Sequence, residues 1–192
     1  LRDTNYPMIV IILIAIVIGG LLGLYNGYFV AYWKAAPFVV TLSMMTIARG
    51  MTYVYSDGRP ISNLPEEFLA IGKGNIAVIP IPTAILIIVF ILANIMLTKL
   101  KFGRYVYAVG GNENAAMVSG INVKKIKMLV YVLSGIACGL AAIILTSRVS
   151  AGLPQAGESY ELDAIAATVI GGTSLSGGRG RLWGTIVGAI LL

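Results

Sequence analysis

An uncharged segment near the amino end has the sequence Met8-Ile-Val-Ile-Ile-Leu-Ile-Ala-Ile-Val-Ile-Gly-Gly-Leu-Leu-Gly-Leu-Tyr-Asn-Gly-Tyr-Phe-Val-Ala-Tyr-Trp33. A helix needs about 20 apolar residues to cross the hydrocarbon core of a bilayer, which is roughly 30 Å thick. Because lipid offers backbone groups no hydrogen-bond partner, a segment that crosses must be helical. This segment therefore predicts a transmembrane helix.

The composition of the whole chain agrees with a membrane protein. Of its 192 residues, 58% are hydrophobic and 11% are charged, whereas soluble domains have about 45–50% apolar and about 25% charged residues. A soluble domain, a disordered chain and a fibrous repeat are therefore excluded. The net charge of +6 does not indicate a nucleic-acid partner, because so apolar a chain uses its basic residues for orientation in the bilayer.

Three further segments are long enough to cross a bilayer, and two apolar segments are shorter. The long ones are Ala36–Tyr55, Ile76–Thr98 and Met128–Ser147, and the shorter ones are Ala164–Leu175 and Leu182–Leu192. We therefore predict an all-α fold, a polytopic transmembrane helical bundle with short or broken helices. Because the sequence does not begin with Met and stops inside an apolar run, we expect it to be part of a longer protein, truncated at both ends.

The charges of the loops predict which side of the membrane each connection faces. Segment 99–127 carries six basic residues against Glu113 alone, whereas segments 56–75 and 148–163 have net charges of −1 and −2. An excess of Lys and Arg marks the cytoplasmic side. Segment 99–127 is therefore predicted to lie inside, and the other two segments outside.

Small residues recur four apart in three of the apolar segments. Helices in lipid are held together by close backbone approach and dispersion contact, which such spacing favours. We predict that these glycines lie at helix–helix contacts, and the alternative is chance, since glycine is common in membrane helices. The residues are Gly19, Gly23, Gly27, Gly135, Gly139, Gly184 and Gly188.

Two segments share one pattern of Thr and Gly. Phe38–Gly50 and Ile165–Gly177 both contain Thr, four residues, Thr, three residues and Gly. By the charge argument they begin on opposite sides of the membrane, as the halves of an inverted repeat would, and such repeats meet near the midplane where solutes cross. Hydroxyls both donate and accept hydrogen bonds. We expect an inverted repeat, with chance as the alternative, and a translocation path lined by Thr41, Thr46, Thr168 and Thr173.

Two polar features inside apolar surroundings have a functional and a structural interpretation. Arg49 is the one ionisable residue within an apolar segment, and it either serves the function or reaches the outer headgroups; we favour the structural interpretation. Segment Gly171–Arg181 has the spacing of a phosphate loop, but Gly178 stands where a Walker A motif needs Lys. We predict a tight connection there and no nucleotide site.

A short helix is predicted inside the basic segment. Asn112 is a good N-cap, Glu113 suits the first turn, and Gly120 can end the helix. So short a helix is not stable by its own propensity. It must dock either on its own bundle or on a soluble partner, and the local sequence leaves both possibilities open.

Several longer motifs span nearly the whole chain. They are Pro37-Phe-Val-Val-Thr-Leu, Asp57-Gly-Arg-Pro-Ile, Phe102-Gly-Arg-Tyr with Gly110-Gly-Asn-Glu, Ser119-Gly-Ile-Asn-Val, and Tyr160-Glu-Leu-Asp-Ala-Ile-Ala-Ala-Thr-Val-Ile-Gly-Gly-Thr-Ser-Leu-Ser-Gly-Gly-Arg-Gly180. In these motifs the chain resembles the membrane permease subunit of ribose-type monosaccharide ABC importers. The resemblance implies that residues 1–192 form a single transmembrane permease domain. It also implies a multi-pass protein of the bacterial cytoplasmic membrane that passes a ribose-like sugar.

The resemblance further implies partners and sites. The permease pairs with a second copy in membrane lipid, receives sugar from an extracytoplasmic sugar-binding protein, and is coupled to a cytoplasmic ABC ATPase that holds the ATP and Mg, so this chain binds no cofactor. The implied ATPase-coupling residues are Gly111, Asn112, Glu113, Ala115, Ala116, Ser119 and Gly120, and on this basis Ala116→Arg is expected to abolish ATPase association. The loop residues implied to face the binding protein are Asp57, Arg59, Glu66, Glu67, Glu158 and Glu161.

The alternative function is that of an ion-gradient-driven secondary transporter of a small neutral solute, a class that also uses inverted repeats. A proton-driven member usually has a carboxylate or His inside the membrane, and here the acidic residues lie in loops or at their boundaries, and His is absent. A sodium-driven transporter needs no such residue, because its ion site can be made of carbonyl and hydroxyl oxygens, so this alternative stays open. We do not expect an enzyme, because the sequence offers no acid–base pair, metal-ligand cluster or activated nucleophile.

Overall fold

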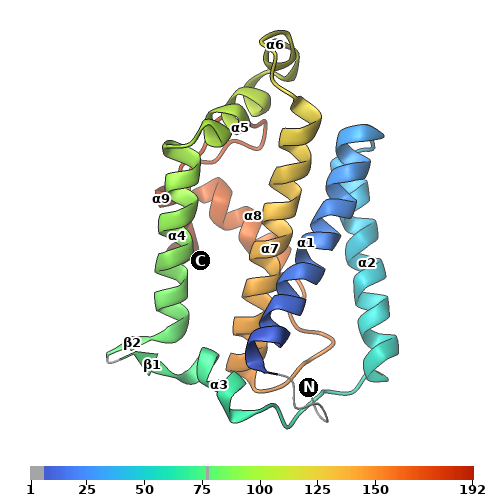
Figure 1. Ribbon diagram of the computed structural model, residues 1–192, viewed down its shortest axis with the longest axis vertical. Coiled ribbons are helices and arrows are strands. Elements are labelled where there is room, and N and C mark those ends of the chain that lie inside the picture. The colour runs from blue at the N-terminus through green and yellow to red at the C-terminus, as the bar shows by residue number, and fades with distance from the viewer. Residues whose placement is uncertain (1–6, 77) are drawn as a thin grey trace. The chain divides into compact units, whose positions relative to one another are not determined.

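The structure, a computed structural model, describes residues 7–76 and 78–192 and consists almost wholly of helices (Figure 1), which confirms the predicted all-α class. The strands β1 (Asn75–Ile76) and β2 (Ile79–Pro80) form a small antiparallel hairpin. The helices in chain order are α1 (Met8–Tyr32), α2 (Pro37–Ser56), α3 (Glu66–Lys73), α4 (Ile81–Thr98), α5 (Lys101–Gly111), α6 (Glu113–Val118), α7 (Val123–Val149), α8 (Tyr160–Ile170) and α9 (Leu182–Leu191).

The chain divides into two compact units. The first comprises the chain up to Leu86 together with Lys127–Ala156, and the second comprises Ile87–Ile126 together with Gly157–Leu192. The boundaries fall within α4 and α7, so each of these helices contributes to both units.

In the first unit, α1 and α7 lie against each other in opposite directions along their glycines. A Cβ added to Gly19 would collide with the backbone of Gly135, and one added to Gly23 would collide with the backbone carbonyl of Tyr131. A Cβ added to Gly27 would lie 3.0 Å from the Cα of Met128. The predicted packing role of these glycines is thereby confirmed, because only a hydrogen atom fits between the two backbones.

In the second unit, glycines of α9 pack against α8. A Cβ at Gly184 would collide with the carbonyl oxygen of Gly171, and one at Gly188 would collide with that of Ala167. This third predicted glycine pair is therefore confirmed as well. The contact makes α8 and α9 a close hairpin around the connection between them.

A small apolar cluster forms where α3 crosses the carboxyl end of α7 and the start of α1. Phe68 and Ile71 of α3 are buried with Ile143 of α7, and Met8 and Ile12 of α1 pack against them. Burial of these side chains stabilises the contact, because their apolar surface is removed from water or from the membrane–water interface. Segment 56–75, which contains α3, and segment 148–163, which begins in the last turn of α7, were both predicted to lie outside, and they meet at one end of the first unit.

The polar anchor of the same contact is Ser147 of α7, whose side chain is fully buried. Its Oγ donates a hydrogen bond to the Phe68 carbonyl at 2.6 Å and accepts one from the Gly72 N–H at 2.7 Å. An added Cβ at Gly72 would lie 2.5 Å from the Arg148 nitrogen, so the backbones of α3 and α7 touch here. The sequence around Ser147 does not indicate this role, because the partners of its hydroxyl are more than 70 positions away.

Replacing Ser147 with Ala is expected to lower the free energy of unfolding by about 1–3 kcal/mol, because two buried backbone groups lose their partner. Thermal unfolding of the purified protein in detergent measures the change. Ser56→Ala is the matched control, since its hydroxyl only donates to the Thr52 carbonyl of its own helix. Equal melting temperatures for the two variants would contradict the anchoring role.

The ends of two helices differ from the predicted spans. The predicted span Ile76–Thr98 begins at Ile81 instead, because the chain first forms the β1–β2 hairpin and Pro82 suits the first helical turn; residue 77 of that span lies outside the described residues. The predicted span Met128–Ser147 begins at Val123, since the Asn122 side chain accepts a hydrogen bond from the Lys125 N–H at 3.1 Å and caps the helix.

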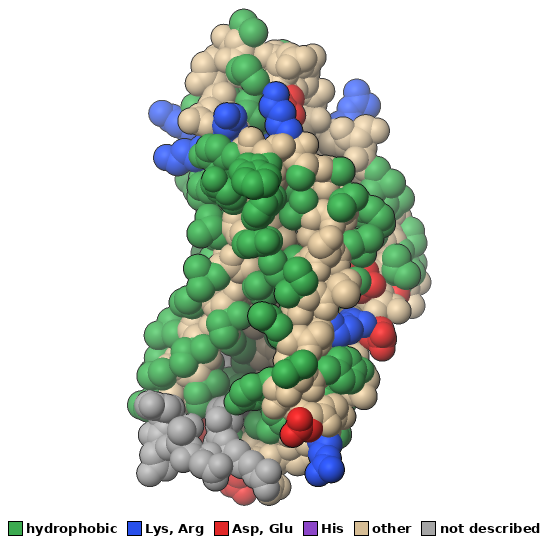
Figure 2. Space-filling view, turned by 90° about the vertical axis from the view of Figure 1, so that its right-hand side faces the viewer, with side chains coloured by type: hydrophobic (Ala, Val, Ile, Leu, Met, Phe, Trp, Pro, Cys, Tyr) green, Lys and Arg blue, Asp and Glu red, His purple; other side chains and the backbone are tan. Residues whose placement is uncertain are grey.

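Within the described residues, three helices are long and apolar enough to cross a membrane, namely α1, α4 and α7. The predicted span in α2 has 20 residues, but Arg49 and several hydroxyl side chains make it less apolar. Large hydrophobic side chains stay exposed along the long helices, for example Ile9 and Leu86, and Figure 2 shows such side chains over much of the visible face. This surface suits lipid and identifies an integral membrane protein.

The two segments of the expected repeat have different local structures. Phe38–Gly50 lies entirely within α2, whereas in Ile165–Gly177 the helix ends at Ile170 and Gly172 has φ +84°. Thr173 and Gly177 therefore lie in a turn, while their counterparts Thr46 and Gly50 lie in a helix. The shared spacing does not correspond to a repeat of secondary structure beyond Ile170.

Candidate functional site

The basic segment folds into two short helices with a sharp break at Asn112. This residue is extended, with φ −157° and ψ 106°, and it ends α5 and begins α6. Its side-chain oxygen accepts a hydrogen bond from the Ala115 N–H at 3.0 Å. The predicted N-cap is confirmed, and it satisfies a backbone donor that a helix start leaves open.

The other end of α6 closes as a Schellman motif. Gly120 has φ +80°, its N–H donates to the Met117 carbonyl, and the Ile121 N–H donates to the Ala116 carbonyl, both at 3.0 Å. A positive φ is readily available to glycine. The prediction that Gly120 ends the helix is therefore confirmed, and α6, a helix of six residues, is capped at both ends.

Burial divides the predicted coupling residues into two groups. Ala116 is only 3% exposed and belongs to the core, so its side chain packs against its own chain. Ala116→Arg would therefore disturb the docking of α6 itself, which corrects the expectation that this residue sits on the partner-facing surface. The other six, Gly111, Asn112, Glu113, Ala115, Ser119 and Gly120, are exposed.

The most exposed apolar side chains of α6 are two that the sequence analysis did not select. Met117 is 58% exposed and Val118 is 90% exposed. No local signal in the sequence indicated them, because neighbouring residues of a helix point in different directions and only packing decides which of them is buried. Together they form an apolar tip on a helix whose base is buried.

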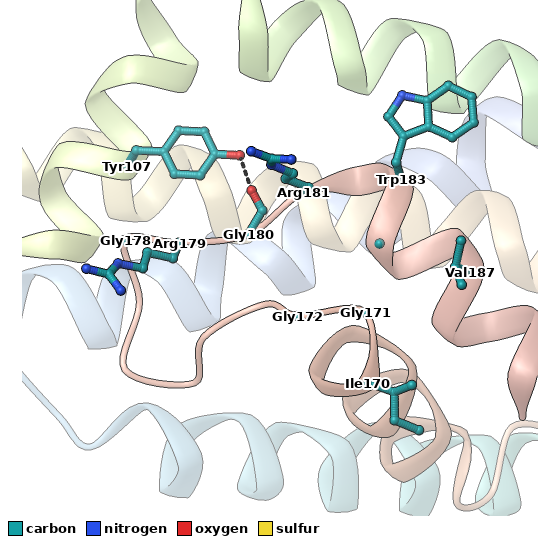
Figure 3. Close-up of a pocket in the computed structure, with 11 residues that line it drawn as sticks. Tyr107, Ile170, Gly171, Gly172, Gly178, Arg179, Gly180, Arg181, Trp183 and Val187 are labelled. Carbon is teal, nitrogen blue, oxygen red and sulfur yellow. Dashed lines mark hydrogen bonds between the residues drawn. The ribbon is translucent and has the colours of Figure 1, made fainter.

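The glycine-rich connection Gly171–Arg181, here called the glycine loop, docks on α5. Within the loop, the Ser174 N–H donates to the Arg179 carbonyl at 2.9 Å. The Tyr107 hydroxyl of α5 donates to the Gly180 carbonyl at 2.9 Å, as Figure 3 shows. An added Cβ at Gly110 would lie 2.6 Å from the Gly178 nitrogen. The predicted tight connection is therefore confirmed, and it is tied to the helix that leads into α6.

The four threonines of the predicted path are held in different ways. Thr41 and Thr46 of α2 each donate to carbonyls of their own helix, at 3.0 Å to Pro37 and 3.0 Å to Leu42. Thr168 donates to the Ile165 carbonyl at 2.8 Å. Thr168 and Thr173 lie together on the wall of a hollow of about 350 Å³ in the second unit, so the structure brings these two together beside the glycine loop.

The residues predicted to face a binding protein lie at helix ends. Asp57 is left-handed with φ 50° at the end of α2, and Glu66 and Glu67 form the first turn of α3. An isolated bridge between Ile61 and Gly152 ties this loop to the segment after α7. The remaining residues are Arg59 in the turn after α2, Glu158 before α8, and Glu161 in the first turn of α8.

Comparison with known proteins gives a consistent picture. The family model described as "branched-chain amino acid transport system / permease component" matches residues 3–192. A ribose import permease protein of Haemophilus influenzae is 50% identical over 97% of this chain and 59% of its own length. A ribose import permease protein of Bacillus subtilis is 49% identical over 87% of this chain and 52% of its own length.

More distant relatives include an L-arabinose ABC transporter permease protein of Azospirillum brasilense, which is 38% identical over 91% of this chain and 51% of its own length. The chain thus spans a little over half the length of the curated relatives it matches. No solved structure matches it. Since the family model covers nearly every residue, the chain belongs to the family described in those words, a family of transport-system permease components.

Proposed function

We propose that the protein is the pore-forming permease subunit of an ATP-driven importer that passes a monosaccharide across the bacterial cytoplasmic membrane. The observation that carries the proposal is α6, a helix of six residues that is capped at both ends, buried at Ala116 and exposed at Val118. A rigid apolar tip in the most basic loop of a membrane protein suits a soluble partner on the cytoplasmic side. Membership of a permease family supports the same assignment.

The proposed partners follow from this arrangement. A cytoplasmic ABC ATPase would grip the tip of α6, and ATP and Mg would belong to that subunit. An extracytoplasmic sugar-binding protein would deliver the solute to the loops that carry Asp57 and Glu66. A second copy of the permease would complete the pore in membrane lipid.

The proposed substrate class is a sugar rather than an amino acid. The family description refers to branched-chain amino acids, but the relatives near 50% identity are ribose import permease proteins. Because these relatives are about half identical to this chain, we expect a similar pathway here, one that suits a neutral polyol. A ribose-like monosaccharide is the proposed cargo, and an ion-driven secondary transporter has less support, since the arabinose relative is an ABC transporter permease.

Uptake by membrane vesicles tests the proposal. Vesicles that contain the full-length permease, the ATPase subunit and the binding protein should accumulate labelled ribose when ATP is supplied on the cytoplasmic face, and uptake should survive an uncoupler. Vesicles without the ATPase subunit are the control. Uptake that persists without the ATPase and stops with the uncoupler would instead identify an ion-gradient-driven transporter.

A further inference from the structure

A second, larger hollow in the same unit has a chemistry that sugar transport does not explain. It has a volume of about 800 Å³ and lies between Tyr107 of α5, the glycine loop and the first turns of α9 (Figure 3). This volume is in the range of sites that hold small ligands. The inference drawn from it concerns binding, and it stands whether or not the transported solute is a sugar.

Two basic side chains lie on the wall of the hollow. Arg179 and Arg181 both line it and both are exposed. Among the described residues, neither guanidinium pairs with a carboxylate. The acidic residues that precede the hollow in sequence lie in the first turn of α8, roughly 10 Å or more along the helix from Ile170. Two unneutralised guanidinium groups favour an anion, and their planar donors match the oxygens of a phosphate group.

Another part of the hollow is apolar. Ile170, Trp183 and Val187 line it, and Trp183 is 65% exposed even though its ring contacts Phe90 with centroids 4.7 Å apart. Tryptophan with one apolar and one wet side is typical of the membrane–water interface. The ligand that fits is therefore an amphiphile with a phosphate group and a hydrocarbon part.

The position of the hollow agrees with a lipid headgroup on the cytoplasmic side. The glycine loop touches the last residues of α5, because an added Cβ at Gly178 would lie 2.7 Å from the Cα of Gly111. That residue adjoins α6, in the segment with the largest excess of positive charge. Basic pockets between helices at this membrane surface bind the headgroups of anionic lipids.

We propose that the hollow beside the glycine loop binds an anionic phospholipid, with Arg179 and Arg181 on the phosphate and Trp183 with Ile170 against the start of the acyl chains. A soluble phosphate compound shares only half of this chemistry, since it has nothing to place on the apolar wall. The bound lipid would thus brace the loop that contacts α5.

Native mass spectrometry of the full-length protein, released from nanodiscs of phosphatidylglycerol and phosphatidylcholine, tests the proposal. Retention of phosphatidylglycerol should exceed that of phosphatidylcholine. The double variant Arg179→Gln/Arg181→Gln should weaken phosphatidylglycerol binding roughly tenfold to thirtyfold, because each basic residue contributes about 1 kcal/mol near an anionic surface. Lys99→Gln/Lys125→Gln removes the same charge from exposed positions outside the hollow, and it should change binding less than threefold.

A second double variant and a soluble competitor serve as controls for this binding experiment. Arg179→Lys/Arg181→Lys keeps both charges and should restore most of the binding, which separates loss of the site from loss of the fold. Glycerol phosphate, added as a soluble competitor, should not displace the lipid at equal concentration. Equal retention of the two lipids, unchanged binding in the Gln double variant, or ready displacement by glycerol phosphate would each overturn the proposal.

Discussion

Replacing Val118 with Asp is expected to release the ATPase subunit from the membrane while the permease itself stays folded. Val118 is 90% exposed on the apolar tip of α6, so the substitution removes few contacts within the chain. Truncating a central apolar contact at an interface costs about 2 kcal/mol or more, which corresponds to a roughly thirtyfold or greater loss of affinity. A carboxylate buried in the partner's groove would add a desolvation cost.

Co-purification of the ATPase with the permease measures this loss. Asn114→Asp is the matched control, because it adds the same charge at another exposed position of the same helix without removing an apolar side chain. Recovery of the ATPase should fall strongly with Val118→Asp and little with Asn114→Asp. If both variants retained the subunit equally, the tip of α6 would not be the coupling surface.

Gly135→Ala is expected to destabilise the protein by about 1–3 kcal/mol, the usual cost of forcing atoms into a filled contact. The added methyl group would collide with the backbone carbonyl of Gly19, and backbone on both sides leaves no flexible side chain to move away. The α1–α7 contact would have to open along its length. A lower melting temperature in detergent, with earlier loss of helical circular dichroism, is the expected observation.

Gly50→Ala is the control for that experiment, and it should shift stability in the opposite direction. Gly50 also lies within a helix, but nothing is within 4 Å of the Cβ it would gain. Alanine is favoured over glycine in a helix by about 1 kcal/mol, so this variant should be as stable as the native protein or more stable. Two destabilised variants of similar size would indicate a general intolerance of alanine rather than a close helix contact.

Local chemistry was enough to predict the ends of α6 and the character of the glycine loop. The cap at Asn112 and the left-handed Gly120 depend only on groups within five residues of each other. The same holds for the long apolar helices, whose crossing of lipid requires only length and composition. Charge bias placed segments 56–75 and 148–163 on one side, and α3, which lies in the first of them, does meet the end of α7, which leads into the second.

Other features depend on residues that are far apart in the sequence. The glycine spacing indicated helix contacts, but only the folded chain pairs Gly19 with Gly135 and Gly184 with Gly171. Ser147 anchors backbone groups 75 and 79 positions away, and nothing in its own neighbourhood signals that role. The threonine pattern failed as a repeat of secondary structure because α8 ends at Ile170, two residues after Thr168, while α2 continues to Ser56.

Which face of α6 is buried and which is exposed also depends on residues that are far away in the sequence. In sequence, Ala116 and Val118 are both apolar residues of one short helix, yet one is 3% and the other 90% exposed. Helix propensity and capping depend on a few neighbouring residues and can therefore be predicted from the local sequence. Burial depends on the distant surfaces against which a helix packs. For this protein the long apolar helices and the two ends of α6 followed from short-range patterns, and the identity of each contact surface required the tertiary structure.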